Sequence, residues 1–195
     1  SGSDTLLNVE NLTGSPFADT LTGNAAANVL DGKAGADTLT GKAGNDSYYV
    51  DNVGDQVVEA PNEGTDLVRA TITYTLPVNV ENLILVGTAA LNGTGNTLAN
   101  TLYPSLGNNV LNGGTGTDTV SYVLATTAVK VSLALTTTQA TGGSGSDTLL
   151  AVENLTGSPF ADTLTGSTAV NVLNGGAGND TVNGGLGNDT LIGGL

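Results

Sequence analysis

The sequence contains no cysteine, histidine, methionine or tryptophan, and only four of its 195 residues are lysine or arginine. Without cysteine no disulfide can form, so any cross-link between distant parts of the chain must come from another source. Without histidine or cysteine, and with no serine beside a plausible base, the side chains that nucleophilic catalysis needs are missing. These absences predict that the chain is not an enzyme.

The scarcity of basic residues leaves eighteen acidic residues largely unopposed and gives a formal net charge of −14. Such a chain repels the phosphates of nucleic acids and of anionic lipids, so we expect neither nucleic-acid binding nor membrane insertion. No apolar run approaches the length of a membrane-spanning helix. Multivalent cations are the partners that this charge favours.

Aromatic residues are also few, at 4% of the sequence. Low aromatic content combined with high net charge can indicate disorder. Here, however, leucine and valine recur at regular positions, and 29 glycines lie between them. This regularity favours a folded chain built from repeats.

The best-preserved repeat is a nine-residue unit, G-G-x-G-x-D-x-U-x, in which U is a large aliphatic residue. It occurs in tandem at 175–183 and 184–192. Near the start of the chain the sixth position of this unit recurs every nine residues as Glu10, Asp19, Asn28, Asp37 and Asp46. A large apolar residue follows two places after each of them, so the nine-residue period extends well beyond the tandem pair.

This pattern resembles the RTX (repeats-in-toxin, haemolysin-type) family of secreted bacterial proteins. The resemblance implies an all-β fold, a right-handed parallel β-roll or β-solenoid with short strands and Gly-rich calcium-binding turns. Two nonapeptides would form one coil of eighteen residues, and successive coils would stack about 4.8 Å apart. A single coil cannot bury its apolar face, so stability has to come from stacking neighbours.

A longer repeat encloses the nonapeptides, because residues 1–23 and 144–166 are identical except at Asn8 and Ala151. We expect one continuous β-roll over 1–195. Its segments are a first nonapeptide block at 1–48, irregular coils with longer strands at 49–99, weak repeats and a long strand at 100–143, and a second block at 144–195 that repeats 1–52. Both ends fall inside a motif, so we expect the chain to be a piece of a longer repetitive protein.

Two stretches break the nine-residue period. Apolar residues alternate with polar ones from Val68 to Leu76 and again from Val129 to Leu135, which predicts two half-buried strands. The acidic residues of the first irregular region are expected to form a solvated surface, with one irregular cation site as the alternative. They are Asp51, Asp55, Glu59, Glu63 and Asp66.

Calcium binds six to eight oxygen atoms from carboxylates and backbone carbonyls. Glycines allow a turn to direct its carbonyls at one centre, and the sixth-position Asp would close the cage. The resemblance implies that each ion lies between two loops eighteen residues apart and takes an Asp from each. The residues predicted to hold calcium are Asp19, Gly32, Ala34, Gly35, Asp37, Gly41, Ala43, Gly44, Asp46, Gly113, Gly116, Asp118, Asp147, Asp162, Gly175, Ala177, Gly178, Asp180, Gly184, Leu186, Gly187 and Asp189.

Several loops depart from the pattern. Two acids meet in the pairs Asp19–Asp37 and Asp162–Asp180, whereas Asn28–Asp46, Asn171–Asp189 and Asn100–Asp118 keep only one, and Asp147 meets Val129. Phe17 and Phe160 replace the fourth-position Gly, and Lys33 and Lys42 replace the second. The alternative interpretation is that Asp and Asn only cap turns by bonding the backbone, which stays open for Asn28, Asn100, Asn109 and Asn171.

The resemblance implies a calcium-binding segment of a large secreted or cell-surface protein that leaves the cell by type I secretion, folds on calcium outside it and acts as a structural or adhesive spacer. Its unpaired ends would suit end-to-end self-association, and a cell-surface or extracellular ligand is a further candidate partner. One alternative is an accessory module of a secreted protease, lipase or epimerase. Another is an ice- or glycan-binding face formed by Thr20, Thr22, Thr38 and Thr40.

Overall fold

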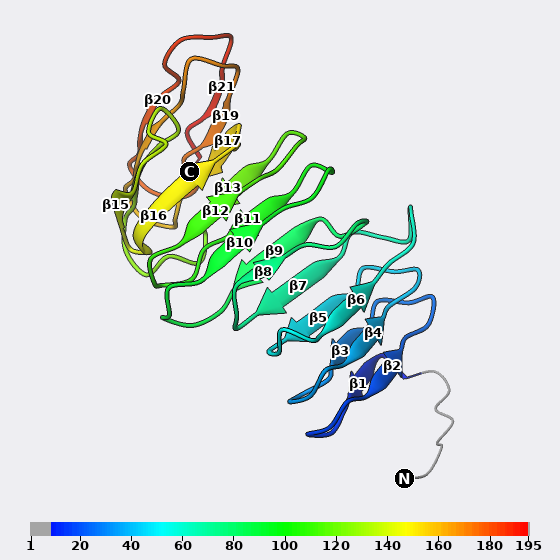
Figure 1. Ribbon diagram of the computed structural model, residues 1–195. Helices are drawn as coiled ribbons and strands as arrows, with labels where there is room; N and C mark the ends of the chain where they lie inside the picture. The colour runs from blue at the N-terminus through cyan, green and yellow to red at the C-terminus, as the bar shows by residue number, and fades with distance from the viewer. Residues whose placement is uncertain (1–8, 195) are drawn as a thin grey trace.

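The structure, a computed structural model, describes residues 9–194 as a β-solenoid in which short strands stack along one axis (Figure 1). Residues 1–8, which begin the duplicated segment, and Leu195 lie outside the described residues. Within residues 9–194 there is no helix, and therefore none with the length and apolarity to cross a membrane.

The largest sheet has ten parallel strands, one from each coil. In order along the solenoid they are β1 (Asn11–Thr13), β3 (Val29–Asp31), β5 (Ser47–Val50), β7 (Leu67–Ala70), β9 (Asn82–Leu85), β11 (Thr101–Tyr103), β13 (Thr119–Ser121), β17 (Asn154–Thr156), β19 (Val172–Asn174) and β21 (Thr190–Ile192). Most have three residues, and only β5, β7 and β9 have four. The strands of the middle coils are thus longer, as expected, but by a single residue.

The remaining strands form three smaller sheets. The first contains β2 (Thr20–Thr22), β4 (Thr38–Thr40) and β6 (Gln56–Val58). The second contains β8 (Tyr74–Thr75), β10 (Asn92–Thr94), β12 (Val110–Asn112), β16 (Gly145–Leu150) and β15 (Gln139–Gly142). The third contains β14 (Lys130–Ser132), β18 (Thr163–Thr165) and β20 (Thr181–Asn183).

The register confirms the coil of eighteen residues. Leu12 pairs with Leu30 in the large sheet, and Leu21 pairs with Leu39 in the first small sheet. The predicted threonine register is also present, because β2 and β4 align Thr with Thr at both ends. The third strand of that sheet places Gln56 and Val58 in the same rows, so the threonine rows are only two coils long.

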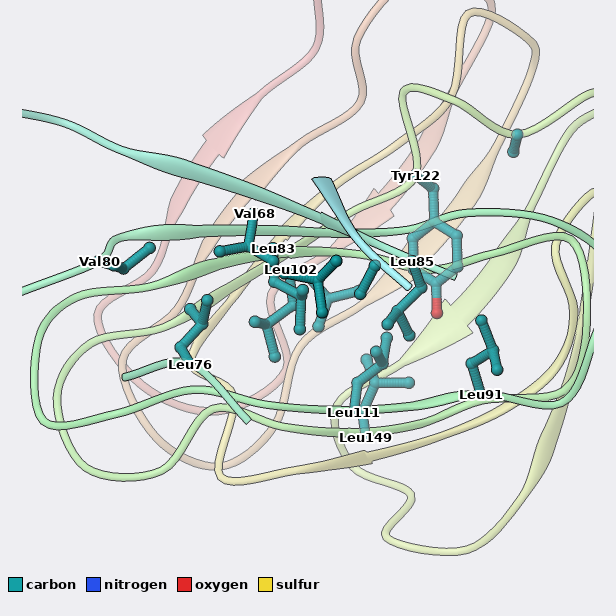
Figure 2. Close-up of a cluster of buried hydrophobic side chains, with 14 of the residues drawn as sticks. Val68, Leu76, Val80, Leu83, Leu85, Leu91, Leu102, Leu111, Tyr122 and Leu149 are labelled. Carbon is teal, nitrogen blue, oxygen red and sulfur yellow. The ribbon is translucent and has the colours of Figure 1, made fainter. Parts of the chain in front are cut away.

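Inward side chains of the strands build the core, one from most three-residue strands and two from each of β5, β7 and β9. In the large sheet, the fully buried row runs through Leu30, Tyr48, Val68, Leu83, Leu102, Val120, Leu155 and Leu173. Leu111 and Leu149 lie against this row from the second small sheet, and Tyr122 closes one side of the cluster (Figure 2). Because each coil contributes only a few such residues, burial depends on the coil above and the coil below.

The first predicted long strand, Val68 to Leu76, is wrong as a single element. It is split into β7 and β8, which lie in different sheets. Val68 and Ala70 follow the register of β5, and the chain then turns because a coil has room for only three or four residues on each side. The alternation still identified the buried residues Val68, Ala70 and Leu76 correctly.

The second predicted long strand, Val129 to Leu135, is wrong as well. The strand β14 ends at Ser132, where the Gln139 side chain donates to the Ser132 carbonyl (3.0 Å) and accepts from its N–H (2.8 Å). Leu135, predicted to face inward, is 47% exposed. A side chain here takes the hydrogen-bonding role of a neighbouring strand and terminates the strand early.

Residues 139–150 form an antiparallel hairpin of β15 and β16, where the sequence predicted a nonapeptide turn. Gly142 and Gly145 adopt φ values of 81° and 82° at its turn, a conformation that favours glycine. The strand β16 then rejoins the stack beside β12. The Gly-Gly-x-Gly pattern at 142–145 therefore makes a hairpin, because the same glycine-rich chemistry serves both kinds of turn.

Replacing Leu102 by alanine is expected to lower the free energy of unfolding by about 2–5 kcal/mol, because the side chain is fully buried between coils. Denaturant unfolding in excess calcium measures this loss. Leu135→Ala is the matched control and should change the free energy by less than about 1 kcal/mol, since Leu135 is half exposed. Equal losses for both variants would contradict the assignment of the core.

Candidate metal centres

The loops that join the strands stack along two edges of the solenoid. On the first edge, each loop leads into the ten-stranded sheet, and the residue immediately before each strand is acidic or Asn in every coil. These residues are Glu10, Asn28, Asp46, Asp66, Glu81, Asn100, Asp118, Glu153, Asn171 and Asp189. On the second edge the equivalent positions include Asp19, Asp37, Asp55, Asn109, Asp162 and Asp180. We call all of these position-six residues.

Beyond the first coil, a hydrogen bond connects each acidic position-six residue to the coil before it. The main-chain N–H of Asp19 donates to Oδ1 of Asp37 (2.8 Å), and that of Asn100 donates to Oδ1 of Asp118 (2.8 Å). The same bond joins Asn28 to Asp46, Asp162 to Asp180 and Asn171 to Asp189 at 2.6–2.9 Å. One side-chain oxygen at position six is thereby used in stacking the coils.

In five loops, which we call the closed loops, position six has a second donor inside its own loop. The closed loops are 14–19, 23–28, 95–100, 157–162 and 166–171. In each, the N–H of the second residue donates to the position-six side chain, as Ser15 does to Oδ2 of Asp19 (2.5 Å) and Ser158 to Oδ2 of Asp162 (2.6 Å). The equivalent bonds in the other three loops measure 2.7 Å. Protein donors alone then satisfy the position-six side chain of each closed loop.

Five other loops, the open loops, lack this donor. They are 32–37, 41–46, 113–118, 175–180 and 184–189. Their second residue adopts a positive φ, from 64° at Lys33 to 99° at Gly114, which turns its N–H away from position six. Lys33 and Lys42 adopt this conformation despite their side chains, at a cost of about 1–2 kcal/mol each. The two lysines therefore preserve the loop geometry that the motif obtains from glycine.

The open loops leave carboxylate oxygens without a partner. Among the described residues, Oδ2 of Asp37, Asp46, Asp118 and Asp180 is buried and accepts no hydrogen bond. Burial is the largest cause that raises the pKa of Asp46 and Asp118. A buried carboxylate without donors is costly, so these four oxygens indicate a missing positive partner.

Backbone carbonyl oxygens lie beside these unpartnered carboxylate oxygens. A Cβ added to Gly113 would collide with both Oδ2 of Asp118 and the carbonyl oxygen of Ala151 from the next coil, so these two acceptors lie side by side. No donor hydrogen separates them. Two or more oxygens that converge without a donor are the arrangement that a hard cation such as calcium completes. The oxygen ligands of the described open loops thus fit calcium.

The asparagines at position six behave differently. The Asn171 side-chain amide donates to the Glu153 carbonyl (2.8 Å), and Asn109 donates to the Leu91 carbonyl (2.7 Å). Asn100 and Asn28 make the same kind of bond to the coil before them. This geometry favours turn capping for the four asparagines, the interpretation that the sequence left open.

Most of the residues predicted to bind calcium lie in the open loops. All of them lie in the five open loops except Asp19, Asp147 and Asp162. Asp19 and Asp162 belong to closed loops. Asp147 lies in β16, where it stacks on Asn109 (3.0 Å) and not on Val129 as expected, while Val129 donates to Asp162 (2.7 Å). The hairpin shifts the register, which spacing alone did not indicate.

The second carboxylate oxygen of Asp147 accepts hydrogen bonds from the hydroxyls of Tyr122 and Thr141, each at 3.2 Å. Burial raises the pKa of Asp147 to about 6, against the lowering effect of its hydrogen bonds. Burial and the neighbouring carboxylate also hold the pKa of Tyr122 well above its usual value. Protein donors therefore satisfy Asp147, in contrast to the aspartates of the open loops.

The acidic residues of the irregular region do not form a solvated surface. Asp51 is exposed, but Asp55, Glu59 and Asp66 are buried, and the last two surround Asp46 of an open loop. Burial, reinforced by the charges of Asp66 and Asp46, raises the pKa of Glu59 to about 8. Burial also raises the pKa of Asp66 to about 6. Sequence spacing missed this cluster because Glu59 occupies a position where every regular loop has glycine.

A signal in the sequence separates the two loop classes, although the motif search did not use it. The residue that ends the preceding strand is Thr in every closed loop, and it is Asp or Asn in four of the five open loops. Asp31 accepts from the N–H of Lys33 (3.0 Å), and Asn174 accepts from that of Gly176 (3.1 Å). This strand-end side chain accepts a hydrogen bond from the N–H that, in a closed loop, donates to the position-six side chain.

Stacked parallel coils with carboxylates and carbonyls converging at their turns define a β-solenoid of the calcium-binding class. Comparison with protein families gives the particular family. The model of the RTX calcium-binding nonapeptide repeat matches four times, over residues 13–48, 94–122 and 156–194. These segments make up just over half of the chain, which therefore belongs to that family. All five open loops lie within them, and a search of curated proteins gives no match.

The buried carboxylates predict an unusual pH dependence without calcium. A carboxyl group whose pKa is higher in the folded chain stabilises the fold fully below its ordinary pKa, and loses that effect as pH rises to the folded value. Between pH 8 and pH 6 the groups involved are Glu59, Asp66 and Asp147. In chelator, acidification over this range should stabilise the fold by about 1–2 kcal/mol, so the folded-to-unfolded ratio rises roughly 5–30-fold.

Circular dichroism at several pH values, with and without chelator, measures this effect. In calcium the trend should reverse, because protons compete with the cation for the same oxygens. A folded fraction that falls on acidification in chelator would contradict the assignment of these groups as buried carboxyls with raised pKa values.

Proposed function

We propose that this chain is a calcium-binding β-roll segment of a large secreted or cell-surface bacterial protein, which folds when it binds calcium outside the cell and acts as a structural or adhesive spacer. The supporting observation is the set of buried, unpartnered aspartate oxygens at the open loops. RTX calcium-binding repeats in a β-solenoid fit such a module, and repeats of this family are typical of secreted bacterial proteins.

The proposed ions lie at the open loops, where the position-six Asp and backbone carbonyls of adjacent coils converge. The ligand residues are those predicted from the sequence in the loops 32–37, 41–46, 113–118, 175–180 and 184–189. Asp19, Asp147 and Asp162 are proposed as weaker or structural positions, because protein donors already occupy their second oxygen. At Asp37, Asp46, Asp118 and Asp180 the proposed ion thus neutralises a carboxylate with an oxygen that accepts no hydrogen bond.

Calcium acts on folding through linkage. Without the ion, stacked carboxylates repel one another along both edges, and the narrow core offsets little of the conformational entropy lost on folding. An ion that binds only the folded chain stabilises it by RT ln(1 + [Ca²⁺]/Kd) at each site, or about 1.4 kcal/mol at ten times Kd. Extracellular calcium modules bind with Kd on the order of 10⁻⁴–10⁻³ M, so several sites together would drive folding at millimolar calcium.

A spacer role follows from the architecture. Stacked coils that share one ten-stranded parallel sheet give an extended rod whose length grows with every repeat. A module composed of repeats suggests a structural part, and we propose that the segment itself carries no catalytic activity. The proposed role needs no ligand other than calcium.

The folding hypothesis is tested by circular dichroism during a calcium titration from chelator to about 10 mM, well above the expected Kd. The β-sheet signal should develop with calcium and should be restored to the unfolded value by chelator. Magnesium at the same concentration serves as the control, because it dehydrates reluctantly and prefers rigid octahedral sites. Identical spectra in chelator and in calcium would contradict the hypothesis.

A matched pair of variants tests where the ions bind. Asp37→Asn should lower the number of bound calcium ions by one, because it removes an unpartnered carboxylate and supplies the capping amide that Asn28 already uses. Asp19→Asn, one coil away in the same row, should leave that number unchanged because Ser15 satisfies Asp19. Calorimetric titration gives the number, and an equal loss in both variants would refute the division into open and closed loops.

A further inference from the structure

The loop between β6 and β7, residues 59–66, differs from every regular loop of the solenoid. It stacks directly on the open loop 41–46, because Val58 pairs with Thr40 in the strands that precede the two loops. Glu59 therefore occupies the position that Gly41 has in the coil below. The loop is two residues longer than its neighbour, so its position-six residue is Asp66, which accepts from the Asp46 N–H (2.8 Å).

Glycine occurs at this first position of the regular loops because a side chain there would meet the position-six carboxylate. A Cβ added to Gly14 would lie 2.7 Å from Oδ2 of Asp19, and one added to Gly41 would collide with Asp46, Glu59 and the Tyr48 hydroxyl. At Glu59 the longer loop makes room for a side chain. That side chain enters the interior of the edge, where its carboxylate meets Asp46 and Asp66.

Asp46, Glu59 and Asp66 consequently form a buried cluster of three carboxylates from two stacked loops. Their ligand oxygens all lie within 4.8 Å of one another, and their exposed fractions are 1%, 7% and 1%. Each has one buried oxygen without a hydrogen-bond partner. The remaining oxygens accept from Asn28 N–H, Tyr48 hydroxyl and Asp46 N–H, respectively.

Nothing basic balances this charge in the part of the chain that the structure describes. The only salt bridge among those residues joins Lys33 to Asp31, one coil away. Glu63 and Glu81 lie close enough to add to the electrostatic repulsion on Glu59, and they line a surface pocket of about 220 Å³ beside the loop. Burying three unpaired carboxylates together is strongly unfavourable, so a cation is needed if they are to remain charged.

We propose that Asp46, Glu59 and Asp66 bind a calcium ion between the open loop 41–46 and the loop 59–66, which lies outside the nonapeptide pattern and supplies two of the three carboxylates. Only oxygen ligands are offered, as calcium requires, and the Tyr48 hydroxyl lies against Glu59. Glu59 and Asp66 lie outside the segments that match the family repeat. The first loop joins β4 to β5 and the second joins β6 to β7, and the strands stack as neighbours, β4 beside β6 and β5 beside β7 (Figure 1).

Three carboxylates distinguish this site from the other four open loops, where one aspartate meets carbonyls. The affinity of calcium sites rises with the number of charged ligands. The site should therefore fill first in a titration, at a calcium concentration at least tenfold below that of the regular loops. It would hold the irregular coils to the first nonapeptide block before the remaining loops are occupied.

Terbium luminescence tests this site, because Tb³⁺ replaces Ca²⁺ at oxygen sites and is excited by a tyrosine close to it. Wild-type protein excited through tyrosine should give a first, tight phase of Tb³⁺ luminescence that calcium displaces. Tyr48→Phe should remove most of that luminescence while calcium still binds. Glu59→Gln, which keeps the shape and removes one charge, should weaken the tight phase by at least tenfold.

Glu63→Gln is the matched control, since Glu63 accepts from the Ala60 N–H outside the cluster, and it should change the tight phase by less than twofold. Circular dichroism at about 10 mM calcium guards against misfolding, because Glu59→Gln keeps the regular loops and should reach the same β-sheet signal as wild type there. A tight phase that is unchanged in Glu59→Gln, or absent from wild type, would overturn the site. Calcium-driven folding in that same variant would leave the proposed function intact.

Discussion

The whole solenoid depends on one hydrogen bond, from the main-chain N–H at position six to a side-chain oxygen of the corresponding residue in the next coil. Both edges repeat it, and it fixes the register of the stack because a shift of one residue would leave the N–H without an acceptor. Asp or Glu supplies the acceptor oxygen in these bonds, whereas a position-six Asn joins the coil before it by donating its side-chain amide to a carbonyl. The recurrence of Asp, Glu and Asn before every strand of the large sheet is therefore a structural requirement first, and a source of metal ligands second.

Whether a protein donor reaches the second side-chain oxygen of the position-six residue decides whether the turn can bind a cation. Where the loop supplies a donor, as at Ser15 and Ser158, the turn is complete without an ion. Where a strand-end Asp or Asn captures that donor, the carboxylate stays open and the coil lacks a positive charge. In each nonapeptide block two closed loops are followed by two open loops, so a coil that closes on protein groups is followed by a coil whose turns lack a protein donor to the second oxygen.

The fold class and the coil of eighteen residues could be predicted because the nonapeptides resemble the RTX family, and the nine-residue period marked the inward rows of leucine and valine. The sequence was insufficient where the period breaks. The hairpin at 139–150 uses the same glycines as a nonapeptide turn, and Gln139 ends β14 through a contact that no local pattern encodes. Glu59 was predicted to be solvated because acidic residues are usually exposed, and only the stacking of a longer loop over Gly41 buries it.

Anomalous scattering from crystals of the calcium-loaded protein tests the central claim most directly, because it locates each ion independently of any change in folding. The account predicts peaks beside the open carboxylates of Asp37, Asp46, Asp118 and Asp180, and none inside the closed loops that carry Asn28, Asn100 and Asn171. Peaks of equal height at closed and open loops, or no peak at any open carboxylate, would contradict it.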